Sequence, residues 1–377
     1  MQVGQKHWTA KSGWTLKTDS EPSTPQLVLA FGGRYTLDDA SHFATLREFY
    51  PDAHILMAST SGEIADIEVH DESIVATAIQ FEKTQIKMIQ VATAEHDNSY
   101  SAGAAIAKAL QGDLLQHVFV IADGQEVNGS ELAKGINEHL PDEVSVTGGL
   151  AGDGPRFEKT LVGLDQAPSS GNIVGVGFYS EHLQVGFGSM GGWDPFGPER
   201  KITKSKDNIL YELDGESALG LYKRYLGEQA QGLPGTALLF PLSVWTEESE
   251  RPLVRTILSV DEENQSMIFA GDVPQGASAR LMKANFDRLI DGASEAARQS
   301  NETFSEKSEF AILISCVGRK LVLGQHIEDE VEIVQEVLGE QASLCGFYSY
   351  GEISPVKDSR RCELHNQTMT ITTFKES

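Results

Sequence analysis

The same arrangement occurs three times along this chain: a helical pattern, an apolar strand, and then a glycine followed by an acidic residue. The three segments span residues 38–64, 130–154 and 328–353. The acidic residues near their ends are Glu63, Asp153 and Glu352. The first polar residues after an apolar strand mark an edge of a sheet, and in open α/β sheets ligands bind where such edges converge. The repetition therefore predicts an architecture, and a candidate site at the ends of its strands.

The rest of the chain supports an α/β fold. Residues 26–31, 117–121 and 310–316 are continuous apolar runs, which is typical of buried strands. Helical patterns alternate with such runs in both halves of the chain, and short hairpin-like runs interrupt the alternation. We therefore predict mixed parallel and antiparallel sheets that are covered by helices.

At 377 residues the chain is long enough for two hydrophobic cores. Residues 1–24 are polar and contain glycine and proline, so we expect them to form an N-terminal arm. The boundary between the two domains is predicted near residue 215, which gives domains of residues 25–215 and 216–377.

Composition excludes several classes of partner. The chain has 30 Lys and Arg against 55 Asp and Glu, a net charge of −25, and a sequence pI near 4.7. Such a surface repels nucleic acid, and there is no polybasic stretch to hold a membrane. No window approaches the roughly 18 apolar residues of a membrane span, and the first residues lack the apolar run of a secretory signal. Together with three cysteines that form no C-x-x-C pair, this predicts a cytoplasmic protein with reduced thiols.

No catalytic constellation stands out in the sequence. The segment Gly148–Gly154 is rich in glycine but lacks the lysine of a P-loop, so it is a tight turn, a ligand loop or both. G-x-S-x-G and H-E-x-x-H motifs are absent. The carboxylates after the strands are either caps of loop ends or ligand contacts, and the neighbouring aromatic residues either belong to the core or line a pocket for a flat ligand.

The segment 344–355, together with 363–370, resembles the C-terminal signature of the FIST family of sensory proteins. Ala58–Ile64 is similar to the family's N-terminal S-T-x-G-E-I element, and Gly148–Gly154 is similar to its G-G-x-x-G-D-G loop. Residues 212–218 and 316–319 also follow in the expected order. The resemblance covers nearly the whole chain, from about residue 26 to residue 374.

The resemblance implies a bacterial signal-transduction protein with N- and C-terminal FIST domains that senses a small ligand. The family is often encoded beside histidine kinases or cyclic-di-nucleotide enzymes, so one of these is the expected partner. The chain itself carries no kinase, cyclase or receiver pattern. The positions expected to contact the ligand are Ser61, Gly62, Glu63, Gly149, Gly152, Asp153, Arg319, Phe347, Tyr348, Tyr350, Glu352, His365 and Asn366.

One branch of the family comprises haem-binding nitric oxide sensors, and other members are proposed to bind amino acids or similar molecules. Haem requires an axial ligand in an apolar pocket, and His365 and Cys316 are the leading candidates here, with Cys345 and Tyr350 also available. Two further hypotheses stay open. An enzyme would use the strand-end carboxylates and Cys316, and a ligand-free scaffold would recruit a basic partner to the acidic surface. We expect a sensor and not an enzyme.

Overall fold

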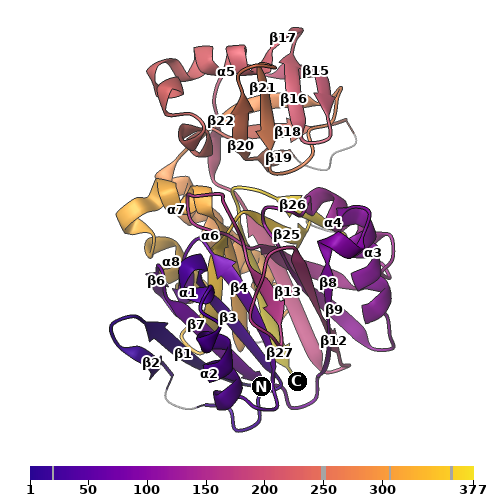
Figure 1. Cartoon of the computed structure of the whole chain (residues 1–377), viewed down its shortest axis with the longest axis vertical. Coiled ribbons are helices and arrows are strands. Elements are labelled where there is room, and N and C mark those ends of the chain that lie inside the picture. The colour runs from indigo at the N-terminus through magenta and orange to yellow at the C-terminus, as the bar shows by residue number, and fades with distance from the viewer. Residues whose placement is uncertain (19–20, 248–251, 305–306, 357–359) are drawn as a thin grey trace.

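The computed structural model describes residues 1–377 except residues 19–20, 248–251, 305–306 and 357–359. The chain forms two bodies (Figure 1). The core body contains three six-stranded sheets and is built from residues 1–192 and 285–377. The inserted domain, residues 193–284, holds a nine-stranded sheet and lies at one end of the core body. The prediction of mixed sheets with covering helices is confirmed.

Each sheet of the core body is based on the same four-stranded unit. The strands of the first unit are β1 (Gln2–Thr9), β3 (Leu27–Gly33), β4 (His54–Thr60) and β7 (Ile74–Gln80). Those of the second unit are β8 (Gln85–Ala92), β9 (Leu115–Ala122), β10 (Ser145–Leu150) and β12 (Asn172–Tyr179). Those of the third unit are β13 (Leu183–Met190), β23 (Phe310–Cys316), β24 (Ser343–Ser349) and β27 (Met369–Glu376).

The pairing is the same in all three units. The second and third strands of each unit are parallel: β3 with β4, β9 with β10, and β23 with β24. The fourth strand then pairs antiparallel with the second strand on its other side, and the first strand pairs antiparallel with the fourth. The three segments that repeat in the sequence are therefore equivalent parts of a threefold repeated fold.

A short exchanged strand links each unit to another. These strands are β5 (Glu63–Ala65), β11 (Val162–Leu164) and β25 (Gly351–Pro355). Strand β5 leaves the first unit and pairs with β24 of the third. Strand β25 leaves the third unit and pairs with β10 of the second, and β11 leaves the second unit and pairs with β4 of the first. The exchange closes a cycle, so no unit completes its sheet alone.

Alternation along the strands explains how the sheets pack. In β9, Phe119 and Ile121 lie in a central core that all three sheets share, whereas Val118 and Val120 lie in a separate core beneath helices. Side chains of a strand point alternately to its two faces, so a continuous apolar strand can serve both cores. The helices of the core body are α1 (Arg34–Leu37), α2 (Ser41–Phe49), α3 (Ser99–Leu110), α4 (Gly129–Asn137), α6 (Phe286–Asn301), α7 (Val317–Leu323) and α8 (Asp329–Leu338).

The remaining strands of the core body extend its sheets. They are β2 (Gly13–Leu16), β6 (Glu68–His70) and β26 (Cys362–His365). Strand β1 pairs with both β2 and β7. Residues 2–9 and 13–16, which the sequence assigned to an N-terminal arm, form strands of the first sheet.

The inserted domain has its own hydrophobic core. Its elements are β14 (Trp193–Pro195), β15 (Arg200–Lys206), β16 (Ile209–Leu213), β17 (Glu216–Ser217), α5 (Ala218–Leu226), β18 (Leu242–Trp245), β19 (Leu253–Arg255), β20 (Ile257–Asp261), β21 (Ser266–Phe269) and β22 (Ser278–Ala284). Residue 215, where the sequence places the domain boundary, lies between the paired strands β16 and β17. Strand pairing therefore divides the chain near residues 193 and 284, and strands from both predicted halves share the sheets of the core body.

Candidate functional site

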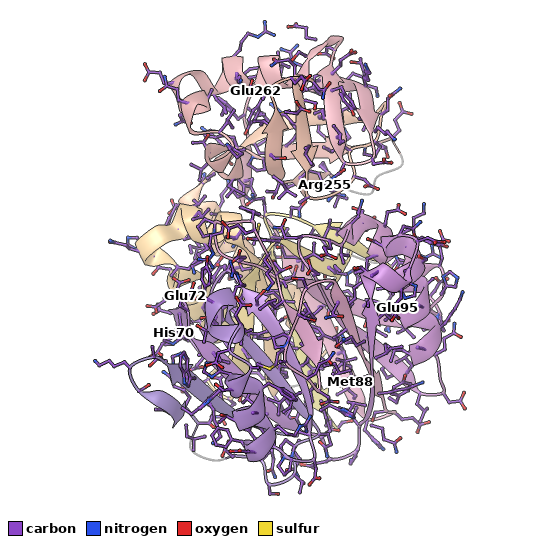
Figure 2. All side chains as sticks on the ribbon, in the orientation of Figure 1. His70, Glu72, Met88, Glu95, Arg255 and Glu262 are labelled. Atoms are coloured by element: carbon purple, nitrogen blue, oxygen red, sulfur yellow. The ribbon has the colours of Figure 1, made fainter. Side chains whose placement is uncertain are left out.

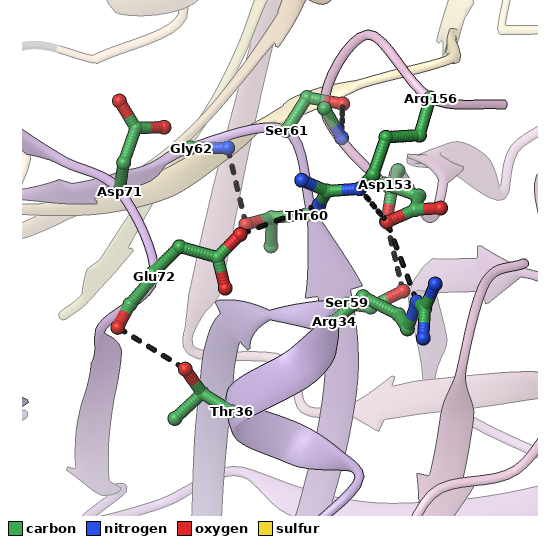
Figure 3. A network of polar contacts seen from close by, with 12 residues as sticks. Arg34, Thr36, Ser59, Thr60, Ser61, Gly62, Asp71, Glu72, Asp153 and Arg156 are labelled. Carbon is green, nitrogen blue, oxygen red and sulfur yellow. Dashed lines mark hydrogen bonds and ion pairs between the residues drawn. The ribbon is translucent and has the colours of Figure 1, made fainter. Parts of the chain in front are cut away.

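The three strand ends singled out in the sequence meet at one junction in the core body. The backbone N–H of Gly152 donates to the carbonyl of Ser59 at 2.9 Å, and that of Ser61 donates to Tyr348 at 2.8 Å. The N–H of Tyr350 donates to the carbonyl of Leu150 at 3.2 Å. The Ser61 hydroxyl accepts from the N–H of Gly154. Residues expected to share a site are thus brought together, as Figure 3 shows for the first two strand ends.

Glu63 and Glu352 occupy equivalent positions at this junction and have equivalent contacts. Glu63 accepts hydrogen bonds from the Thr60 hydroxyl at 2.5 Å and from the hydroxyl and N–H of Ser73 at 2.7 and 3.1 Å. Glu352 accepts from the Ser349 hydroxyl at 2.6 Å and from the hydroxyl and N–H of Thr368 at 2.9 and 3.2 Å. In each unit the donors are the last residue of one strand and the residue preceding another. The two carboxyls therefore join strand ends.

Burial dominates the protonation of both carboxyls. Each is 0% exposed. Loss of solvation raises the pKa of Glu63 to about 7 and that of Glu352 to about 8, although their hydrogen bonds favour the charged form. Side chains so enclosed and so fully hydrogen-bonded are positioned to hold the strand ends together.

Asp153 lies three residues after the end of β10 and has cationic partners. Its Oδ1 accepts from Arg156 Nε at 2.8 Å and lies 3.5 Å from Arg34 Nε. Its Oδ2 accepts from the N–H of Lys159 at 3.3 Å. Arg156 also reaches Glu72 at 3.4 Å, and Figure 3 shows both arginines converging on the buried Asp153. Because each cation already faces acids, this rim is a charge-balanced network and not an open anion site.

Tight packing at the junction explains its glycines. A Cβ on Gly152 would lie 2.4 Å from the Ser61 hydroxyl, and one on Gly62 would lie 2.4 Å from Lys320 Nζ. A Cβ on Gly149 would lie 2.9 Å from an Ile314 methyl. At Gly152 the backbone of Ser61 is also close, so a side chain there would force the strand ends apart, whereas at Gly62 the φ of 139° is what favours glycine. Of the Gly148–Gly154 segment, Gly148 and Gly149 lie within β10, and Gly154, with a φ of 62°, lies beyond the end of that strand.

The predicted aromatic and arginine positions are also internal. Phe347 lies in the central core, and the Tyr350 hydroxyl donates to the carbonyl of Gly154 at 3.0 Å. The Tyr348 hydroxyl donates to Glu330 at 2.7 Å, and Glu330 also pairs with Arg319 at 2.8 Å. Arg319 and Tyr348 are both 0% exposed. Arg319, predicted from the sequence to contact a ligand, is thus enclosed and paired with Glu330 in this structure.

The two haem-ligand candidates do not fit an iron site. His365 is 3% exposed and its Nε2 lies 3.0 Å from the carbonyl of Ser354. Cys316 is 1% exposed, and burial raises the pKa of its thiol, which disfavours the thiolate needed for coordination or nucleophilic attack. No cavity described in the structure is lined by either residue. Among the described residues there is also no cluster of His, Cys, Asp and Glu suited to a metal ion.

Sequence reasoning missed a pocket between the two bodies. It has a volume of about 330 Å³ and is lined by α4 and β26 of the core body and by β18 and β19 of the inserted domain. Trp245, Leu253 and Leu364 give it apolar walls, and Arg255 is the buried charge beside it. Figure 2 places Arg255 where the inserted domain meets the core body. Ligand pockets range from about 300 to 1,000 Å³, so this one suits a small molecule.

Contacts from both bodies border this pocket. Asn128 Nδ2 donates to Asp272 Oδ1 at 3.2 Å, and the N–H of Asp272 donates to the Ser130 hydroxyl at 3.3 Å. Asn366, a predicted site residue, lies nearby, with its Oδ1 3.5 Å from the N–H of Thr256. The strand β26 also connects the pocket to the junction, because His365 is the register partner of Glu352.

A further buried carboxylate was also missed. Asp123 directly follows β9 and is 0% exposed. It accepts from the N–H groups of Gln125, Glu126 and Gly171 and from the Thr160 hydroxyl. The sequence Ala122-Asp123-Gly124, which follows an apolar strand, could have identified Asp123 as a strand-end acid.

Comparison with known proteins gives two family matches. The model of the FIST N domain matches residues 26–216, and that of the FIST C domain matches residues 218–355. No curated protein matches the chain. A solved crystal structure of cyanuric acid hydrolase from A. caulinodans shares 10% identity, with 78% of this chain and 99% of that chain covered, at a TM-score of 0.19. At that score the two folds do not superpose well enough for comparison.

Proposed function

This chain belongs to the FIST family, and from that premise we propose that it senses a small molecule in the pocket between its two bodies. FIST domains are associated with the sensing of small ligands in signal transduction. The observation that carries the proposal is the pocket's position, because its walls come from both the core body and the inserted domain. A ligand there would contact both bodies and change how they are held together.

The output of such a sensor would be a change at its surface. We propose that a separate histidine kinase or cyclic-di-nucleotide enzyme, in the cytoplasm, reads the position of the inserted domain. We also propose that the protein acts by binding and not by turnover. This is supported by the strand-end carboxylates Glu63 and Glu352, whose oxygens are already occupied by internal donors. No helix in the described part of the chain could cross a membrane.

Labelled protein tests the sensor proposal. The three native cysteines are buried, so Arg224→Cys on the inserted domain and Arg298→Cys on the core body can be labelled with a dye pair. Both arginine side chains are more than half exposed. In a screen of small metabolites, at least one compound should raise the melting temperature and change the energy transfer between the dyes. Trp245→Ala, which removes a pocket wall, should weaken both effects.

The matched control is Trp14→Ala, which removes a tryptophan on β2, away from the pocket. A compound that acts equally on the Trp245→Ala variant binds elsewhere and contradicts the proposed site. A screen in which no compound changes either signal contradicts the sensor itself and favours a ligand-free scaffold.

A haem-based nitric oxide sensor is the narrower version of this proposal, and the geometry around His365 and Cys316 gives it no support. We expect the purified protein to develop no specific Soret band after addition of haemin, because neither side chain lines a described cavity. The absorption spectrum is measured with and without reductant and nitric oxide. A band that shifts with nitric oxide and weakens in His365→Ala would contradict this expectation and restore the haem sensor.

A further inference from the structure

Arg255 is a buried cation whose described partners are all neutral. It ends β19 and is 6% exposed. Its Nε donates to the backbone carbonyl of Asp272 at 3.1 Å, within the inserted domain. Its Nη1 donates to the carbonyl of Leu364 at 2.8 Å, in the core body. These two bonds use two of the five N–H groups of a guanidinium.

No carboxylate in the described part of the chain lies within ion-pair distance of Arg255. Asp272 contributes its backbone carbonyl, while its carboxylate accepts from Asn128. Burial lowers the pKa of Arg255, and the more distant charges of Glu363 and Asp272 only partly oppose this. Buried charges in proteins are ordinarily paired, and an unpaired one is costly. The guanidinium therefore has no carboxylate of the described residues in direct contact, and Glu363 and Asp272 act on it only from a greater distance.

The surroundings of Arg255 are adapted to a planar group and open to the pocket. A Cβ on Gly271 would lie 3.2 Å from Arg255 Cζ, so a side chain there would crowd the guanidinium. Arg255 lines the pocket together with Trp245, Leu253 and Leu364. Besides Arg255, the lining carries two cations, Lys134 and Arg361, and three acids, Glu138, Glu363 and the partly buried Asp272. Arg255 is the one charged residue of this lining that is buried, and its two described hydrogen bonds leave guanidinium N–H groups for a ligand.

We propose that the pocket binds a small carboxylic acid in its ionised form, with the carboxylate on Arg255 and the apolar part against Trp245, Leu253 and Leu364. Guanidinium and carboxylate match in a planar, two-bonded geometry, which gives charge selection and orientation together. Inorganic phosphate offers the same charge chemistry without an apolar part. This inference rests on the proposed sensor function, and it names the chemical class of ligand that the pocket accepts.

Paired probes test the charge requirement on the unchanged full chain. Acetate, propionate and benzoate are titrated by calorimetry beside their neutral amides and inorganic phosphate. At least one acid should bind, and its amide should bind on the order of tenfold or more weakly, since a hydrogen bond to a charged group is stronger than a neutral one. An amide that binds as well as its acid, or a panel in which no acid binds, overturns the proposal. Phosphate that binds as tightly as the best acid also overturns it, because the apolar contacts would then contribute nothing.

Two substitutions in the pocket test whether Arg255 is the residue that binds the carboxylate. Arg255→Gln should weaken binding of the acid on the order of tenfold or more, whereas Lys134→Gln, which removes an exposed cation from the same lining, should change it by about twofold or less. Circular dichroism checks folding, and the acid–amide comparison holds even if Arg255→Gln unfolds. Equal losses in both variants overturn the assignment to Arg255. A neutral compound that changes the dye signal while no acid binds would leave the sensor standing and remove only the carboxylate inference.

Discussion

Replacing Arg319 by methionine should lower the free energy of unfolding by about 3–5 kcal/mol, because it removes the cation from a fully buried pair. Arg319 Nε and Nη2 donate to Glu330 at 3.1 and 2.8 Å. Nη1 and Nη2 also donate to the carbonyls of Gly191 and Leu289, at 3.0 and 2.8 Å. Methionine replaces much of the apolar stem but leaves Glu330 buried without its cation and dependent on the hydroxyls of Ser315 and Tyr348. Denaturant-induced unfolding measures the difference.

The matched control is Arg319→Met combined with Glu330→Gln. With the acid neutralised as well, the double variant should regain part of the lost stability, since no unpaired charge remains. A single variant within about 1 kcal/mol of the wild type would contradict this account, and would mean that water reaches Glu330. The pair also fixes the chain at Gly191, close to where the inserted domain begins, so its role is structural.

The repeated helix–strand–glycine–acid pattern was enough to predict the junction. It located Glu63, Asp153 and Glu352 at strand ends that the structure brings together. The sequence could not show that β5, β11 and β25 cross between units. These strands have three, three and five residues, and nothing in such short runs specifies a distant partner. Because these three strands cross between units and fill the junction, the positions that were expected to contact a ligand are buried inside it.

The pocket between the two bodies could not be predicted from the sequence, for a different reason. The boundary predicted at residue 215 falls inside the insertion of residues 193–284, so β14, β15 and β16 were assigned to the first predicted domain and the later strands of the insertion to the second. One signal was available. Arg255 lies in the largely apolar run Leu253-Val254-Arg255-Thr256-Ile257. A charged residue is rare in a buried strand. A cation inside an apolar run indicates either that the strand has an exposed face or that the cation has a specific partner. Since Arg255 is buried, the structure favours a specific partner.

The free energy of unfolding should fall as the pH rises from 6.5 to 8.5, on the order of 2 kcal/mol, because of Glu63 and Glu352. Their pKa values in the folded protein are raised by burial to about 7 and about 8, whereas an unfolded glutamate titrates near 4.5. The folded state therefore keeps protons that the unfolded state has lost. This stabilising contribution is fully present below pH 4.5 and is lost as the pH rises through the folded pKa values.

Three buried histidines set the lower limit of that window, because burial lowers the pKa values of His7, His42 and His117. Burial lowers the pKa of His7 to about 4 and that of His117 to about 3, so both contribute stability above about pH 6.5 that is lost in acid. Above about pH 7.5 the unfolded histidines are neutral as well and this contribution is constant, so the carboxyls account for most of the slope there. Glu352→Gln cannot ionise, so it should flatten the dependence more than Glu63→Gln does, because the higher pKa of Glu352 places more of its titration in this range. Unfolding curves at each pH measure both slopes. A wild-type slope of zero, or one unchanged in both variants, would mean that the hydroxyls of Thr60, Ser73, Ser349 and Thr368 keep the carboxylates ionised in the folded protein.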